Sequence, residues 1–307
     1  MVSGFLIAVV MVAADAPAAD KAGPRPQEQG FPVPDPEAMF DRFFGEPTED
    51  EKRQLAQIPV SLKEERRVGT AVVEAYLADL KLQGIRVVSR GRDVEYLRDL
   101  VETIRPQMQN SERYRTIAVY VAKSPECDAR SFPGGTLVFF EGLLDFAESE
   151  AALISIVGHE LSHLDRGHQL QRVRRMKLAE GAFSGGDPPF SLEQLLATGT
   201  VLLRVWTRPF QPEDEVEADR DGAAWAYRAG YDPREMARLF QDLERRQQAN
   251  RIPLPDFLQS HPLPLDRHRA IMELYGELRR NEPSQNLHVG KENLRRQVAR
   301  TRREFPE

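Results

Sequence analysis

The chain has 307 residues, of which 41% are apolar and 29% charged, a balance typical of soluble globular proteins. Its 42 basic and 48 acidic residues give a net charge of −6, whereas nucleic-acid-binding proteins usually carry a basic surplus, so no nucleic-acid partner is expected. Cys127 is the only cysteine, which excludes an intramolecular disulfide and any cysteine-rich metal site. A metal ion in this protein must therefore be held by His, Asp and Glu.

The N-terminus has features of a targeting segment. Residues 4–14 form an apolar run too short to span a bilayer comfortably, and no Lys or Arg precedes it. Ala14-Asp15-Ala16 follows, a small-x-small pattern typical of signal-peptidase sites. Residues 1–16 are therefore predicted to be a signal peptide or a short membrane anchor. This favours an exported protein, periplasmic or associated with the membranes of the cell envelope, over a cytoplasmic one.

Residues 17–57 are rich in proline and are predicted to form an extended linker or leader. Within it, Phe40, Phe43 and Phe44 have the spacing of one face of a short helix. The simpler interpretation is a helix docked on the main domain. The alternative is a segment that occludes a cleft.

Residues 58–280 are predicted to form one mainly helical domain with a small β-sheet, an α+β fold. Apolar residues at helical spacing, with Gly and Pro at the boundaries, indicate helices over 61–84, 94–104, 148–171, 192–206, 213–229, 233–246 and 267–279. Apolar, β-branched runs indicate strands over 116–121 and 136–140. Residues 281–307 are expected to be a charged C-terminal tail, frayed or weakly helical.

Three of the six histidines lie within ten residues, between 159 and 168. His159 and His163 are four apart on a predicted helix, about 40° from each other around its axis, so both can bind one Zn²⁺. Glu160 lies about 100° further round, where it can take a proton from a water molecule instead of binding the metal. The apolar residues before this motif indicate a buried helix. Burying two histidines and a glutamate without partners would be costly, which argues against a purely structural pattern.

A catalytic zinc site needs a third protein ligand. His168 lies about 140° from His163 around a continuous helix and cannot join the site without a break in that helix. The long spacing, with a third histidine six residues after the second, is excluded because Gln169 stands there. The third ligand must therefore come from another element.

The acidic sequence over residues 213–219 is the best source of that ligand. Glu215 and Asp219 are four apart on one face of a predicted helix. Glu215 could bind the zinc ion, while Asp219 could accept the second N–H of a liganding histidine. Taken alone, the cluster would more simply be a solvated helix start, favoured by the helix dipole.

Together these motifs resemble the HtpX, BepA and CAAX-prenyl-protease family of zinc metallopeptidases. The matching sequences, over residues 60–275, are His-Glu-Leu-Ser-His at 159–163, Glu-Val-Glu-Ala-Asp at 215–219, Pro-Gly-Gly at 133–135, Glu-Gly-Leu-Leu at 141–144, Gly-Tyr-Asp-Pro at 230–233 and Ser-His-Pro-Leu-Pro at 260–264. The resemblance implies a gluzincin-type domain, with the active-site helix beside a short sheet. It also implies one Zn²⁺ per chain bound by His159, His163 and Glu215, with Glu160 as the general base.

The same resemblance implies a substrate-binding strand. Gly135, Thr136, Leu137 and Val138 would lie at the sheet edge, where a substrate peptide would pair as an added strand. Three features depart from the family: Asp-Ala-Arg at 128–130 where Asn-Ala-Phe is usual, no multispan membrane helices and no C-terminal repeat domain.

Three further roles stay open at this point. His261 could stabilise the oxyanion as a catalytic residue, bind zinc as a fourth ligand that holds the enzyme latent, or be a loop histidine. Arg267 is a weaker candidate for oxyanion contact. His268 and His288 are expected to lie at the surface.

The expected function is a zinc metalloendopeptidase acting on protein or peptide substrates, such as misfolded or envelope proteins, in protein quality control. The alternative is a latent, chaperone-like zinc-binding protein with little proteolytic turnover. Peripheral membrane association is compatible with the N-terminus, and the sequence does not indicate the oligomeric state.

Overall fold

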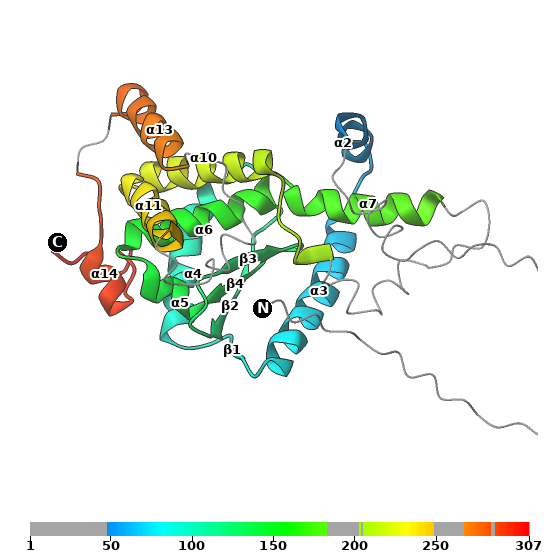
Figure 1. Ribbon diagram of the computed structural model, residues 1–307, viewed down its shortest axis with the longest axis horizontal. Helices are drawn as coiled ribbons and strands as arrows, with labels where there is room; N and C mark the ends of the chain where they lie inside the picture. The colour runs from blue at the N-terminus through cyan, green and yellow to red at the C-terminus, as the bar shows by residue number, and fades with distance from the viewer. Residues whose placement is uncertain (1–47, 183–202, 204, 249–266, 284–285, 307) are drawn as a thin grey trace, which may run out of the picture.

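The structure is a computed structural model, which describes residues 48–182, 203, 205–248, 267–283 and 286–306 (Figure 1). The described helices are α2 (Glu49–Ala56), α3 (Leu62–Leu82), α4 (Arg92–Ile104), α5 (Glu141–Phe146), α6 (Glu150–Asp165), α7 (His168–Ala182), α10 (Pro212–Arg228), α11 (Arg234–Gln248), α13 (Arg267–Asn281) and α14 (Lys291–Arg296). A 3-10 turn, η1 (Arg105–Gln107), follows α4. None of the helices in this described part is both long enough and apolar enough to cross a bilayer. The predicted α+β class, helical with a small sheet, is confirmed.

Four short strands form one mixed sheet in the order β1-β2-β4-β3. Their bounds are β1 (Arg86–Val88), β2 (Ala118–Lys123), β3 (Ala129–Phe132) and β4 (Thr136–Phe140). The two central strands, β2 and β4, are parallel, and each edge strand is antiparallel to its neighbour. The positive φ of Gly134 and of Gly135, +82° and +91°, allows the tight turn from β3 into β4.

The prediction that the strand over 136–140 lies at the sheet edge is wrong, while the role of its residues in substrate binding stays a prediction. Thr136, Leu137 and Val138 lie in β4, which pairs with β2 on one side and with β3 on the other. Its backbone groups are therefore already used in two ladders, and no further strand can add to it. The edge strand on that side is β3, which the sequence analysis did not predict.

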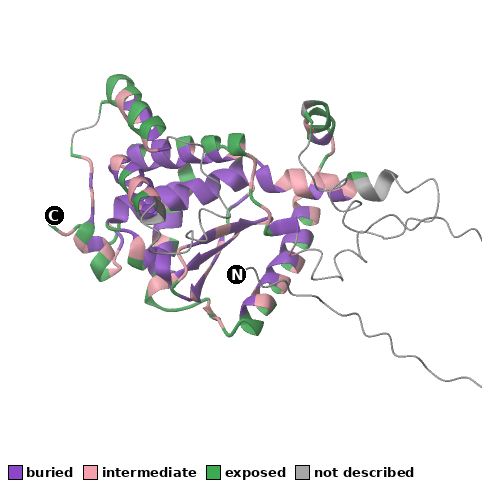
Figure 2. Cartoon of the chain, in the orientation of Figure 1, coloured by how far each residue is buried: buried purple, intermediate pink, exposed green. Residues whose placement is uncertain are grey.

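Both faces of the sheet are covered, as the apolar run of β4 requires. Leu137 and Phe139 point into the core formed with α4 and α6, while Val138 and Phe140 point into a second core formed with α3 and α7. All 16 residues of α6 are buried. The helix lies between the sheet and α10 (Figures 1 and 2), and the side chains of His159 and His163 are fully buried.

Two further expectations need correction, and two others cannot be compared with the described residues. The helix predicted over 148–171 is broken: α6 ends at Asp165, Gly167 adopts a φ of +74°, and α7 begins at His168. The predicted linker contains α2, which starts at Thr48 with a capping box to Glu51. The phenylalanine segment at 40–44 and nearly all of the helix predicted over 192–206 lie outside the described residues.

The described part of the C-terminal tail, residues 286–306, contains a short helix, α14, which agrees with the weakly helical of the two expectations. His288 is buried and pairs with Tyr231 in a parallel bridge, so it is not a surface residue. The carbonyls of Val289 and Gly290 accept the N–H groups of Ala151 and Glu150, at 3.0 and 3.2 Å. These donors belong to the first turn of α6 and have no partner within the helix. The tail therefore caps the N-terminus of α6.

Candidate metal centre

The two histidines of the motif lie on one face of α6, one helical turn apart. Ser149 caps the helix by accepting the N–H of Ala152 at 3.2 Å, and the apolar residues around the motif bury it completely. The Nε2 atoms of His159 and His163 are 3.1 Å apart, and neither side chain is exposed. The prediction that the two imidazoles share one face is confirmed.

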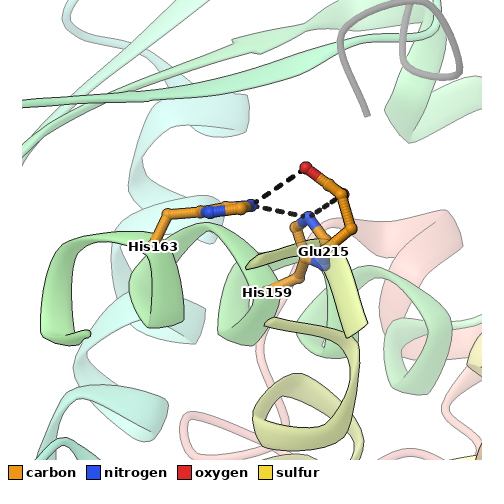
Figure 3. A group of neighbouring side chains, drawn as sticks. All are labelled: His159, His163 and Glu215. Atoms are coloured by element: carbon orange, nitrogen blue, oxygen red, sulfur yellow. Dashed lines mark hydrogen bonds and ion pairs between the residues drawn. The ribbon is translucent and has the colours of Figure 1, made fainter. Parts of the chain in front are cut away.

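Glu215 reaches the same point from α10. Its Oε2 lies 3.4 Å from Nε2 of His159 and its Oε1 lies 3.6 Å from Nε2 of His163, as Figure 3 shows. Among the described residues, these three alone form a group of metal-ligating side chains with donor atoms within 4.8 Å of one another. Two imidazole nitrogens and one carboxylate fit a catalytic zinc ion, which takes three protein ligands and keeps one position open.

The other ring nitrogen of His159 faces Asp219. Its Nδ1 lies 2.9 Å from Oδ1 of Asp219, the geometry expected of a carboxylate that orients a ligating histidine. Burial lowers the pKa of His159, but hydrogen bonds with Asp219 and Glu215 outweigh that effect and raise the pKa to about 9. The imidazole is thus strongly stabilised in its charged form by the carboxylates of α10.

Arg267 completes this side of the site. The guanidinium group, at the start of α13, is buried over the ring of Phe240 at 4.0 Å and hydrogen-bonds both carboxylate oxygens of Asp219. Burial raises the pKa of Asp219, but Arg267 and His159 lower it further than burial raises it, so Asp219 stays ionised. The expectation that Arg267 contacts an oxyanion stays a prediction, because its contacts with Asp219 use only its Nε and Nη2 atoms.

His163 is held differently. Its Nδ1 lies 2.8 Å from Nδ1 of His168, and its ring stacks on Phe210 with 3.9 Å between centroids. Burial lowers the pKa of His168. The contact between His168 and His163 was not predicted, because the helix was expected to continue past Gly167. Gly167 was the available signal, because a glycine readily adopts the positive φ that breaks a helix.

Glu160, the predicted general base, is fully buried next to His159 on α6. Two cations lie within electrostatic reach, Arg130 on β3 and Arg267 on α13. Burial lowers the pKa of both arginines, but nearby carboxylates, Glu160 among them, raise it more. His261, the other candidate catalytic residue, lies outside the described residues.

Comparison with known proteins gives consistent matches. A family model for peptidase family M48 matches residues 93–275. The chain is 28% identical over 159 residues to the beta-barrel assembly-enhancing protease of Escherichia coli (strain K12), covering 48% of this chain and 32% of that protein. It is 30% identical over 145 residues to the mitochondrial metalloendopeptidase OMA1 of Arabidopsis thaliana, covering 47% of this chain and 28% of that protein.

The alignments therefore span about a third of the length of these curated relatives. The family model matches a larger share of this chain than the alignments with these relatives do. It covers more than half of the 307 residues and includes both helices that carry the candidate ligands, α6 and α10. The chain belongs to peptidase family M48.

Proposed function

We propose that the protein is a zinc-dependent metalloendopeptidase. The observation that carries this proposal is the buried cluster of His159, His163 and Glu215, with donor atoms within 4.8 Å of one another. Membership of a peptidase family supports the reaction class, and two curated relatives carry the words protease and metalloendopeptidase in their names. In the described residues, nothing favours the alternative of a latent, chaperone-like zinc-binding protein.

The proposed mechanism assigns each side chain one task. Zinc in this site would supply a Lewis acid and bring the pKa of a water molecule to about 7. Glu160 would accept a proton from the attacking water and deliver it to the leaving amine. Asp219 holds His159 in the orientation needed for ligation, and Arg267 keeps Asp219 ionised.

The substrates we propose are proteins or peptides, with misfolded or envelope proteins as the natural class. The name of the Escherichia coli relative, which refers to β-barrel assembly, supports an envelope setting. The apolar run over residues 4–14 supports export or membrane attachment. These two observations support the role in protein quality control that we propose.

The test is cleavage of casein or of an unfolded protein by the wild type and by the Glu160→Gln variant. The wild type should cleave in a chelator-sensitive manner with one zinc per chain. Glu160→Gln should keep the zinc and lose cleavage by about 10²- to 10⁴-fold, the usual worth of a general base. Equal activity in both proteins would refute this mechanism, and a wild type without stoichiometric zinc would refute the metal site.

A further inference from the structure

His168 is a buried titratable group that contacts His163 and that the mechanism above does not use. It is the first residue of α7, placed there by the break at Gly167. Its side chain is only 3% exposed, and its Nδ1 lies 2.8 Å from Nδ1 of His163. Without the break, a residue five positions after His163 would point about 140° away from it. The bend therefore creates this contact.

The second nitrogen of His168 faces the helix that carries Glu215. Its Nε2 lies 3.4 Å from Oε2 of Glu217 and 3.6 Å from Oδ1 of Asp214. Both carboxylates belong to α10. Helix α10 therefore supplies a metal ligand and also the carboxylates that face the outer histidine nitrogens, directly at His159 and through His168 at His163.

Metal ligation by His163 determines which nitrogen donates and which accepts in each of these hydrogen bonds. A histidine that ligates through Nε2 carries its proton on Nδ1 and must donate it. For His163 the acceptor is Nδ1 of His168, which must therefore hold a lone pair there and carry its own proton on Nε2. That proton points at the carboxylates of Glu217 and Asp214, which can only accept it. In this chain of hydrogen bonds, each ring nitrogen that carries a proton then faces an acceptor, and each nitrogen with a lone pair faces a donor.

Contacts on either side keep His168 in position. The adjacent Gln169 donates its side-chain amide to the carbonyl of Ser131 at 2.5 Å, which ties the start of α7 to β3. Phe210 stacks on the opposite partner, the ring of His163, at 3.9 Å. The two imidazoles are therefore fixed by independent elements, and neither can turn away without losing packing.

We propose that His168 is a positioning residue, which accepts the Nδ1 proton of His163 and so fixes the tautomer and ring orientation in which His163 ligates the metal. The proposal rests on the proposed zinc site. Outer partners of this kind are worth about 10- to 100-fold in metal affinity when they are removed.

The test compares two near-isosteric replacements. His168→Asn carries its amide oxygen where His168 has Nδ1, so it can still accept the proton of His163. His168→Leu has almost the same shape and no acceptor. Zinc affinity is measured by competition with a chromophoric chelator, and the Co²⁺-substituted proteins are compared by their visible absorption. Thermal unfolding of the zinc-free proteins reports any general structural damage.

We expect His168→Leu to weaken zinc binding by about 10- to 100-fold and to alter the Co²⁺ spectrum, with His168→Asn close to the wild type in both. If the leucine variant binds zinc as the wild type does, or if the asparagine variant is as weak as the leucine variant, the proposal is wrong. Should His168→Leu not fold, His168→Gln replaces it. The amide of that glutamine lies at the position of Nε2 and cannot accept the proton of His163, so this variant protein should also have a lowered zinc affinity.

These outcomes are separable from those of the proposed function. A wild type that binds no zinc contradicts the metal site itself. A wild type that binds zinc and cleaves through Glu160, alongside an unaffected His168→Leu, refutes the positioning role alone.

Discussion

Gly158 and Gly222 bring the two ligand-bearing helices into direct backbone contact. A Cβ atom on Gly158 would lie 2.9 Å from the Cα of Gly222, closer than such atoms approach in real structures. The contact lies one residue before His159 on α6 and three residues after Asp219 on α10. Only two residues without side chains allow α10 to come close enough for Glu215 to reach both imidazoles.

Gly222→Ala should therefore weaken both the fold and the metal site. The new Cβ would lie 2.6 Å from the carbonyl oxygen of Ser155 and 2.8 Å from the backbone nitrogen of His159. Because both neighbours are backbone atoms, the helices must move apart, at a cost of about 1–3 kcal/mol in the free energy of unfolding. Glu215 would be drawn away with α10, so zinc affinity should fall as well. Urea unfolding and chelator competition measure the two effects.

Gly276→Ala is the matched control for that substitution. Gly276 also lies inside a helix, α13, but an added Cβ there would meet only the end of the Arg280 side chain, at 3.5 Å. Alanine is the better helix former by up to about 1 kcal/mol, so this variant should be as stable as the wild type or more so. If Gly222→Ala behaves like Gly276→Ala, the close crossing does not determine the site.

The local part of the site could be predicted from the sequence, because it depends on helix periodicity alone. Four-residue spacing places His159 beside His163, and Glu215 beside Asp219, whatever the rest of the chain does. The pairing of these two helices followed from chemistry, since two buried histidines need a further ligand.

The parts that were missed depend on contacts distant in sequence. Strand β3 includes Arg130 and Ser131 and follows Asp128, so it lacks the alternating apolar pattern by which strands are recognised. Whether β4 is central or at an edge is decided by that strand, and not by the sequence of β4 itself. The pairing of Arg267 with Asp219 joins residues 48 positions apart, for which no local pattern exists.

Arg267→Met should be strongly destabilising. The substitution removes the cation that faces Asp219 and leaves a carboxylate that is only 8% exposed without its strongest partner. Removing one partner of a buried ion pair typically lowers the free energy of unfolding by about 3–5 kcal/mol. His159 would lose its orientation with Asp219, so zinc affinity should fall too. The free energy of unfolding from urea titration and a chelator competition provide the measurements.

The double variant Asp219→Asn, Arg267→Met is the control for that pair. It removes both charges together, so its loss of stability should be smaller than the sum of the two single losses. Additive losses would mean that the two side chains do not act as a pair.

Zinc binding should depend on pH through His159. With a pKa raised to about 9, this imidazole is protonated at neutral pH in the absence of metal, and zinc must displace its proton. Apparent zinc affinity should therefore rise by about tenfold per pH unit up to about 9 and then level off. The stability of the metal-free protein changes in the opposite sense. The contribution of His159 is complete below the unfolded-state pKa of about 6.5 and is lost as the pH rises through about 9.

Chelator competition across this pH range, together with proton release followed by an indicator dye, checks the expectation. Asp219→Asn removes one of the two carboxylates that raise the pKa of His159, so the rise in affinity should move to lower pH. An affinity that does not change between neutral pH and pH 9 would show that His159 is already neutral before zinc binds.

Gly290→Ala should reveal how far the active-site helix depends on the C-terminal tail. Gly290 has a φ of +77°, and an added Cβ would lie 2.8 Å from the Cβ of Glu150 and 2.7 Å from Nε2 of His288. Gly84 has nearly the same φ, +79°, but nothing lies within 4 Å of an added Cβ. Gly84→Ala should therefore cost only backbone strain, about 1–2 kcal/mol in the free energy of unfolding. Gly290→Ala should cost clearly more, because the tail must separate from the first turn of α6. Urea titration of both variants gives the difference directly, and equal losses would mean that the tail does not support α6 in solution.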